Sequence, residues 1–391
     1  MFREIEYRRV SSFSVVVILC GALALLAGCA TSPTEAPPNW NGTNQVQNAE
    51  SATNHVAGSL TNLLSLHTNL ASLTATNRLH LNGTNRPPAT NVFKVQPPPV
   101  YTWTSLKRWT ETQRINSPKL LAKSPLFTYA VTSDRGVMVL AIGTREATWN
   151  GVVVHLGFAP EFIDGEIYLH GLDLQKSLEP LLCEPPQVFP TNRIVVIDPG
   201  HGGMNAGTIS VADHHPEKEF TLDWARRIKP LLEQEGWQVF LTRTNDVDIA
   251  LSNRVTIAEF HHADLFLSLH FNSAAPDPVP VGIATYCLTP MGMPSSLTRG
   301  YPDILFQNFP NNNFDGLNMQ LSERLQRALL HATGMEDRGV NRARFIGVLR
   351  GQRRPSVLIE GGFLSNPHEA RRIADPQFRQ KLAEAVATAL K

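Results

Sequence analysis

The chain has 391 residues and carries 35 lysines and arginines against 34 aspartates and glutamates, a formal net charge of +1. This length exceeds one typical domain, so we expect two folded units together with non-globular segments. Because the net charge is close to zero, it gives no reason to expect attraction toward nucleic acid, and we predict no nucleic-acid partner.

The first 29 residues have the organisation of an export signal. Arg3, Arg8 and Arg9 precede an apolar run over residues 13–26, which is the order found in secretory signal peptides. A membrane-spanning helix is the alternative, but the uncharged run is shorter than the roughly 20 residues that cross a bilayer. We therefore predict that residues 1–29 are a signal and not part of the fold.

The end of this run resembles a bacterial lipoprotein processing site, because the small residues of Leu-Ala-Gly precede Cys29. The resemblance implies an exported chain anchored to a membrane by a lipidated Cys29, and stable anchoring requires more than one acyl chain. Ala30 follows the cysteine, and similarity to sorted lipoproteins then favours the periplasmic side of the outer membrane. Cys183 and Cys287 are left as thiols, and the sequence leaves open whether they pair.

Residues 30–98 are rich in Asn, Thr and Pro, with a recurring Thr-Asn pair. This composition predicts a low-complexity tether without a packed core. As a flexible coil, it would span about 40–50 Å root-mean-square. Such a segment separates an anchor from a folded domain.

Residues 99–187 regain apolar content and turn signals, and we predict a small β-rich domain. Strands are expected over residues 127–131, 136–142 and 151–156, followed by a hairpin over 160–168 and a helix near 172–181. The pattern loosely resembles the module called copper-amine-oxidase N-like. A ligand-binding role and a purely structural spacer role both stay open.

From residue 190 to residue 391, strand and helix patterns alternate. Strands are predicted over residues 194–197, 237–241, 264–269 and 356–360, with helices over 220–232 and 251–261. Unbroken apolar strands that alternate with helices are typical of an α/β fold with a mostly parallel twisted sheet flanked by helices. The connection between residues 287 and 317 is long and without a predicted element, and we interpret it as a lid or binding loop.

Reactive side chains fall at the predicted strand ends. His201 lies just past the first strand, His270 ends the third and Glu360 ends the last. Because ligands bind outside the carboxyl ends of strands in open α/β sheets, we expect the three side chains to share one crevice. For each of the two histidines, the alternative is a buried, hydrogen-bonded histidine with a structural role.

Glu217 begins the helix that follows Pro216, where its carboxylate can face the same crevice or simply complement the helix dipole. Glu219, His214 and His215 are alternative donors nearby. Two imidazoles and one carboxylate, with one position left open, are a common ligand set for catalytic Zn²⁺. The doublet at residues 261–262 is better interpreted as solvated histidines at a helix end.

Four motifs in this region, at residues 198–203, 217–218, 268–272 and 359–366, resemble the N-acetylmuramoyl-L-alanine amidases of the Amidase_3 type. The resemblance extends over about 195 residues in the same order and spacing. It implies that His201, Glu217 and His270 bind zinc and that Glu360 is the catalytic carboxylate. It also implies that the substrate is the amide between N-acetylmuramic acid and L-alanine in peptidoglycan, with a protein activator as a further possible partner.

Two alternatives stay open: a zinc peptidase that cuts another amide, and a non-catalytic wall-binding lipoprotein that keeps the fold. Retention of all four site residues argues against the second. In this setting the loop over residues 287–317 is expected to gate substrate, in preference to an autoinhibitory helix, and residues 99–187 are expected to bind the wall or to act as a spacer.

Overall fold

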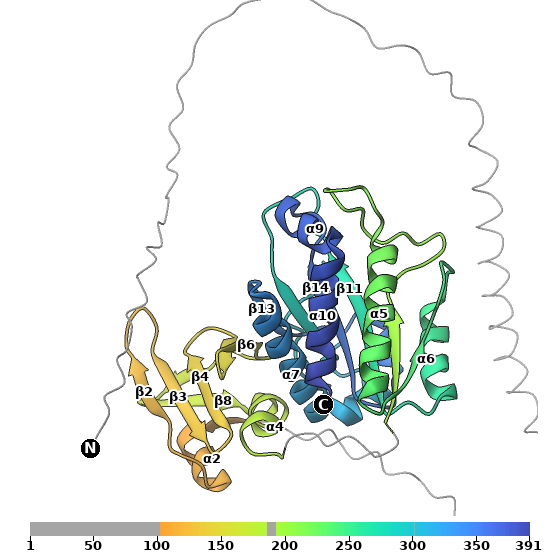
Figure 1. Ribbon diagram of the computed structural model, residues 1–391. Coiled ribbons are helices and arrows are strands. Elements are labelled where there is room, and N and C mark those ends of the chain that lie inside the picture. The colour runs from red at the N-terminus through yellow and green to blue at the C-terminus, as the bar shows by residue number, and fades with distance from the viewer. Residues whose placement is uncertain (1–101, 186–192, 301) are drawn as a thin grey trace, which may run out of the picture. The chain divides into compact units, whose positions relative to one another are not determined.

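The computed structural model describes residues 102–185, 193–300 and 302–391 (Figure 1). These residues belong to one compact unit that runs from Val95 to Lys391. The predicted signal, the predicted lipidation at Cys29 and the predicted tether over residues 30–98 lie outside the described residues. Within the described part of the chain, every helix is too short or too polar to cross a membrane.

The C-terminal half alternates strands and helices as the sequence predicts. Its elements are β9 (Ile194–Pro199), α5 (Glu217–Gln234), β10 (Gln238–Leu241), α6 (Leu251–Phe260), β11 (Leu265–Asn272), β12 (Ile283–Cys287), η2 (Pro310–Phe314), α7 (Asp315–Thr333), β13 (Asp337–Arg342), α8 (Gly347–Arg350), β14 (Ser356–Phe363), α9 (Pro367–Ala374) and α10 (Pro376–Ala389).

Local sequence explains the limits of α5. Pro216 holds an extended backbone immediately before the helix, a position where proline is well tolerated. Gly236, at a φ of 84°, ends the helix, because the amide of Trp237 donates to the carbonyl of Leu232 and that of Gly236 to Glu233. This pair of bonds forms a Schellman motif.

The sheet has the strand order β10-β9-β11-β14-β12-β13-β6-β5-β4-β3-β2. β10, β9, β11 and β14 are parallel neighbours, but β12 pairs with β14 in the antiparallel direction. Only ten residues without a helix join β11 to β12, and a parallel return needs a longer crossover. The whole sheet is therefore mixed. Among the strands after residue 190, β12 and β13 are again parallel, so the predicted mostly parallel arrangement is confirmed there except at the pair of β14 and β12.

The N-terminal elements are β1 (Trp103–Ser105), α2 (Leu106–Gln113), β2 (Lys119–Ala122), β3 (Thr128–Ser133), β4 (Gly136–Ala141), β5 (Glu146–Trp149), β6 (Val152–His155), β7 (Glu161–Ile163), β8 (Glu166–His170), α3 (Gly171–Asp173), η1 (Leu174–Leu178) and α4 (Glu179–Leu182). β2 to β6 form an antiparallel meander. β6 pairs with β13 at Val154 and Val340, so the meander extends the same sheet.

The meander and the C-terminal half meet at a second feature, which we call the junction: Asp173, Lys176, Asp315 and Arg342. Asp173 is fully buried and accepts hydrogen bonds from the amides of Gly157 (2.7 Å) and Phe158 (2.8 Å). Lys176 pairs with Asp315 at 3.4 Å. Arg342 also donates to the carbonyl of Lys176 and to the hydroxyl of Ser177. The contacts of Lys176 and Arg342 therefore join the two halves with polar bonds, while those of Asp173 lie within the N-terminal half.

The two faces of the C-terminal sheet carry different cores. Val357 and Ile359 of β14 pack with α5, α7 and α10 on one face, which Figure 1 shows in front of the strands. Leu358 lies on the other face, with residues of α6 and α8. Since side chains alternate along a strand, Glu360 shares the face of Leu358.

Candidate metal centre

His201, Glu217 and His270 converge on one point at the carboxyl ends of β9 and β11. One ligand atom from each lies within 4.8 Å of the others. His201 Nε2 lies 3.0 Å from Glu217 Oε2, and His270 Nδ1 lies 3.0 Å from Glu217 Oε1. The structure thus brings together the three residues that the sequence singled out. We call His201, Glu217, His270 and Glu360 together the metal centre.

Glycines make room for this convergence. A side chain at Gly200 would meet the His270 ring at 2.3 Å, and one at Gly207 would meet Glu217 Oε2 at 2.6 Å. His201 itself has a φ of 62°, a left-handed conformation that is uncommon for a residue with a side chain. The loop after β9 therefore follows a path that the packed imidazoles and carboxylate require.

Glu217 is fixed by its surroundings. Besides the imidazoles, it accepts hydrogen bonds from the backbone amides of Phe271 (2.9 Å) and Thr208 (3.1 Å). Burial favours the neutral acid, but the hydrogen bonds from His201 and His270 hold the pKa of Glu217 well below its usual range. An anionic carboxylate between two imidazoles results.

Asn205 orients His201. Its side-chain carbonyl oxygen lies 2.9 Å from His201 Nδ1 and also accepts from the amide of Gly207 at 3.3 Å. Because a carbonyl oxygen only accepts, Nδ1 carries a proton, and Nε2, which faces Glu217, carries a second proton when it donates to that carboxylate. This is how partners of ligating histidines select the tautomer. The sequence analysis did not single out Asn205, although its place four residues after His201 is a usable signal.

Glu360 lies on the neighbouring strand β14, in register with His270 of β11. Its Oε2 atom is buried and has no hydrogen-bond partner. Burial, and then the charge of Glu217, raise the pKa of Glu360 well above its usual range. A buried carboxylate oxygen without a partner is costly, so this atom is the least satisfied group of the centre.

Two buried arginines hold the loop that carries His201. Arg254 donates to Asp198 Oδ1 at 2.6 Å, to the carbonyl of Pro199 at 2.9 Å and to that of His201 at 2.8 Å. Arg243 donates to the carbonyls of Pro199 (3.0 Å) and Gly200 (2.8 Å). These two side chains therefore hold the backbone of the loop in place, a role that the sequence pattern did not reveal.

The alternative donors do not join the centre. His215 pairs with Glu219 at 2.7 Å, and both side chains are more than half exposed. His261 ends α6 and stacks on Phe240, with ring centroids 3.7 Å apart. Cys183 and Cys287 are both free, so the open question about a disulfide is answered in favour of separate thiols.

The connection after β12 is pinned at its base. Arg344 donates to the carbonyls of Pro290 (2.9 Å) and Met293 (2.8 Å), and the amide of Ser296 donates to the carbonyl of Arg342 at 2.9 Å. Residues 297–300 are exposed. The predicted long loop is present up to η2, with a fixed base and an exposed tip.

The residues present suit a divalent metal ion. Two imidazole nitrogens and one carboxylate oxygen are a donor set typical of catalytic zinc with an open coordination position. The unpaired Glu360 oxygen lies beside this set and is free to accept a proton. The arrangement has the donors to hold a metal ion and, next to them, an oxygen that can accept a proton.

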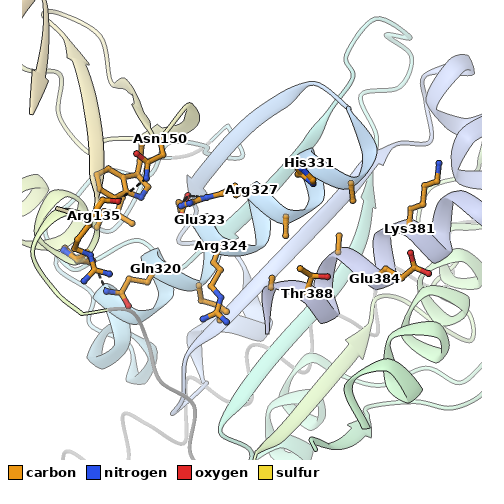
Figure 2. Close-up of a pocket in the computed structure, with 18 residues that line it drawn as sticks. Arg135, Asn150, Gln320, Glu323, Arg324, Arg327, His331, Lys381, Glu384 and Thr388 are labelled. Atoms are coloured by element: carbon orange, nitrogen blue, oxygen red, sulfur yellow. Dashed lines mark hydrogen bonds and ion pairs between the residues drawn. The ribbon is translucent and has the colours of Figure 1, made fainter. Parts of the chain in front are cut away.

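A cavity of about 800 Å³ lies elsewhere, between α4, α7, α10 and the turns of the meander. Figure 2 shows Arg135 and Asn150 on the meander side and Lys381, Glu384 and Thr388 on α10. None of the four residues of the metal centre lines it. The three-residue donor set described above lies outside this cavity, at the strand ends.

Known proteins are similar to the C-terminal half of the chain. A family model described as Amidase_3, N-acetylmuramoyl-L-alanine amidase, matches residues 195–391. The amidase AmiA of Escherichia coli strain K12 is 30% identical over 217 residues, which are 50% of this chain and 74% of that protein. AmiC of Neisseria meningitidis serogroup B is 33% identical over 221 residues, 50% of this chain and 51% of that protein.

A solved N-acetylmuramoyl-L-alanine amidase from Clostridium difficile 630 is 29% identical, with a TM-score of 0.43 and coverage of 51% of this chain and 96% of that chain. The family match spans half of the chain and includes every residue of the metal centre. The chain belongs to the N-acetylmuramoyl-L-alanine amidase family of the Amidase_3 type.

Proposed function

We propose that the chain is a zinc-dependent amidase that hydrolyses the bond between N-acetylmuramic acid and L-alanine in peptidoglycan. Family membership supports the reaction class. The observation that carries the proposal is the unpaired Glu360 oxygen beside a cluster of His201, Glu217 and His270.

The roles of the residues follow from their chemistry. A zinc ion held by His201, Glu217 and His270 would polarise the scissile carbonyl and lower the pKa of a water molecule toward about 7. Glu360 accepts the proton of the attacking water at Oε2 and passes it to the departing amine of L-alanine. Asn205 keeps the proton of His201 on Nδ1, so that Nε2 remains a donor to the metal. Acyl transfer goes directly to water, without a serine or cysteine nucleophile.

Digestion of purified peptidoglycan by the zinc-loaded full chain tests this function. We expect mass spectrometry to find stem peptides with a free L-alanine amino group and intact glycan strands. Glu360→Ala and chelated enzyme serve as controls and should release nothing. Fragments cut inside the peptide would support the alternative of a zinc peptidase, and an absence of products despite bound zinc would contradict the proposal.

We further propose that the chain acts in the cell envelope, anchored through a lipidated Cys29 to the periplasmic side of the outer membrane. The support is the order of charged, apolar and small residues over positions 1–29. Labelling cells with a radioactive fatty acid should mark the wild-type chain and leave Cys29→Ser unmarked. Equal labelling of both would contradict the anchor. The domain boundaries, a wall-binding role for residues 99–187 and a protein activator stay predictions.

A further inference from the structure

An exposed arginine lies in the loop after β12, on the side of the sheet that carries Glu360. Arg299 sits in the exposed tip of the loop after β12, and its guanidinium carbon lies 4.3 Å from the centroid of the Phe345 ring. Stacking over an aromatic face fixes the plane of a guanidinium group and leaves its edge available for hydrogen bonds.

The loop holds this position through its base. Ser296, three residues earlier, bonds to the end of β13: its amide donates to the carbonyl of Arg342, and its hydroxyl lies 3.1 Å from Asn341 Oδ1 and accepts from the amide of Arg342 at 2.8 Å. The backbone around Arg299 is therefore tied to the sheet three residues before the tip.

Phe345 places this arginine on the face of the sheet that carries Glu360. It packs against the cluster that contains Leu358 and Tyr286. Leu358 is two residues before Glu360 on the same face of β14, and Tyr286 is its neighbour on β12. In agreement, Arg299 is the cation whose charge acts on Glu360 and opposes the rise in its pKa.

Arg299 has no counter-ion in the part of the chain that the structure describes: no carboxylate there lies within ion-pair distance. The other arginines near the centre, Arg243 and Arg254, are buried and use their donors on backbone carbonyls. A stacked guanidinium with an open edge is suited to bidentate binding of a carboxylate.

We propose that Arg299 binds a free carboxylate of the stem peptide close to the scissile amide, and so makes the enzyme prefer stems with an acidic residue there over stems in which that acid is amidated. This inference rests on the proposed function, because it names a feature of the same substrate. It assigns to the loop after β12 a recognition role at a fixed position.

Two synthetic probes test it: N-acetylmuramoyl-L-alanyl-D-isoglutamyl-L-lysine and its D-isoglutamine counterpart. Binding is first measured by calorimetry with the zinc-loaded full chain carrying Glu360→Gln. This variant is used so that the probes bind without being cleaved. We expect the acid probe to bind about tenfold more tightly than the amide probe. This factor corresponds to the difference in free energy between a hydrogen bond to a charged group and one to a neutral group. Adding Arg299→Ala should remove this ratio, whereas Arg299→Lys should keep part of it and Arg108→Ala, an exposed control on α2, all of it.

Turnover then separates the two proposals. With Glu360 intact, Arg299→Ala should raise KM for the acid probe about tenfold and leave KM for the amide probe unchanged. An acid-to-amide ratio that is unchanged by Arg299→Ala would overturn the assignment, even if both probes are cleaved. Tight, Arg299-dependent binding of the acid probe without cleavage by the wild-type chain would instead support Arg299 and contradict the amidase function.

Discussion

The metal centre and the junction both bury carboxylates, but the hydrogen bonding of these carboxylates differs. At the junction, Asp173 is surrounded by donors: two backbone amides and the hydroxyl of Ser177 at 3.3 Å. At the metal centre, Glu217 is equally well bonded, while Glu360 keeps a buried oxygen without a partner. Burial alone therefore does not identify a reactive group. A buried acceptor without a hydrogen-bond partner, next to a group of convergent metal donors, identifies the reactive group.

The largest expected effect is on catalysis. Glu360→Gln removes the base and keeps the size of the side chain, so turnover should fall by about 10²–10⁴-fold, the usual contribution of a general base. Zinc content, measured by atomic emission on the purified variant, should stay at the wild-type level. Loss of the metal together with activity would mean that Glu360 is a ligand and not the base.

The next largest effect is on stability below the centre. Arg254→Ala leaves Asp198 buried with one of its counter-charges removed, and breaking a buried ion pair costs about 3–5 kcal/mol. Urea unfolding measures the loss. Lys229→Ala, which breaks the exposed pair with Glu233, is the matched control and should cost less than about 1 kcal/mol. Similar values for both variants would mean that the buried network does not stabilise the loop.

Removal of the junction carboxylate should have a smaller effect and spare the chemistry. Asp173→Ala leaves the amides of Gly157 and Phe158 without acceptors, at a cost of about 1–3 kcal/mol for a buried group. The melting temperature should fall, while the zinc affinity of the full chain stays unchanged. A loss of zinc affinity would show that the junction and the metal centre are coupled, against the comparison made above.

The smallest expected effect is a pH dependence beside the junction. Burial lowers the pKa of His155, although its contact with the carbonyl of Val340 opposes this. A histidine whose folded pKa lies below its ordinary value of about 6.5 is held neutral, so its contribution to stability is complete above that pH and is lost as the pH falls below it.

Thermal melts between pH 7.5 and pH 5.5 measure this effect. His155→Gln should lose less stability than the wild type over that range, whereas His331→Gln, an exposed control on α7, should behave as the wild type does. An identical pH response in all three chains would contradict a neutral, partly buried His155.

The sequence predicted the site better than the sheet. His201, His270 and Glu360 follow apolar runs that can only be buried strands, so their positions at one sheet edge follow from the periodicity. The direction of β12 depends on a ten-residue connection without a sharp sequence signal. The pairing of β6 with β13 joins residues 186 positions apart, and no local pattern encodes such a contact.

The residues that contact the site residues could also not be predicted from the sequence. Arg254 reaches Asp198 from a helix 56 residues further along the chain, and Arg299 reaches the Phe345 ring from the loop after β12. Each distance depends on how separate elements pack. Asn205 is the exception, because it lies in the same loop, four residues after His201.

The most direct test of the central claim is hydrolysis of N-acetylmuramoyl-L-alanyl-D-isoglutamyl-L-lysine in water enriched in ¹⁸O, followed by mass spectrometry of both products. If Glu360 activates water at the metal centre for attack on the carbonyl next to L-alanine, one ¹⁸O atom enters the carboxylate of the muramic acid and none enters the peptide, and Glu360→Gln incorporates none. Incorporation of ¹⁸O into a peptide carboxylate, or equal labelling by the Glu360→Gln variant, would contradict the account.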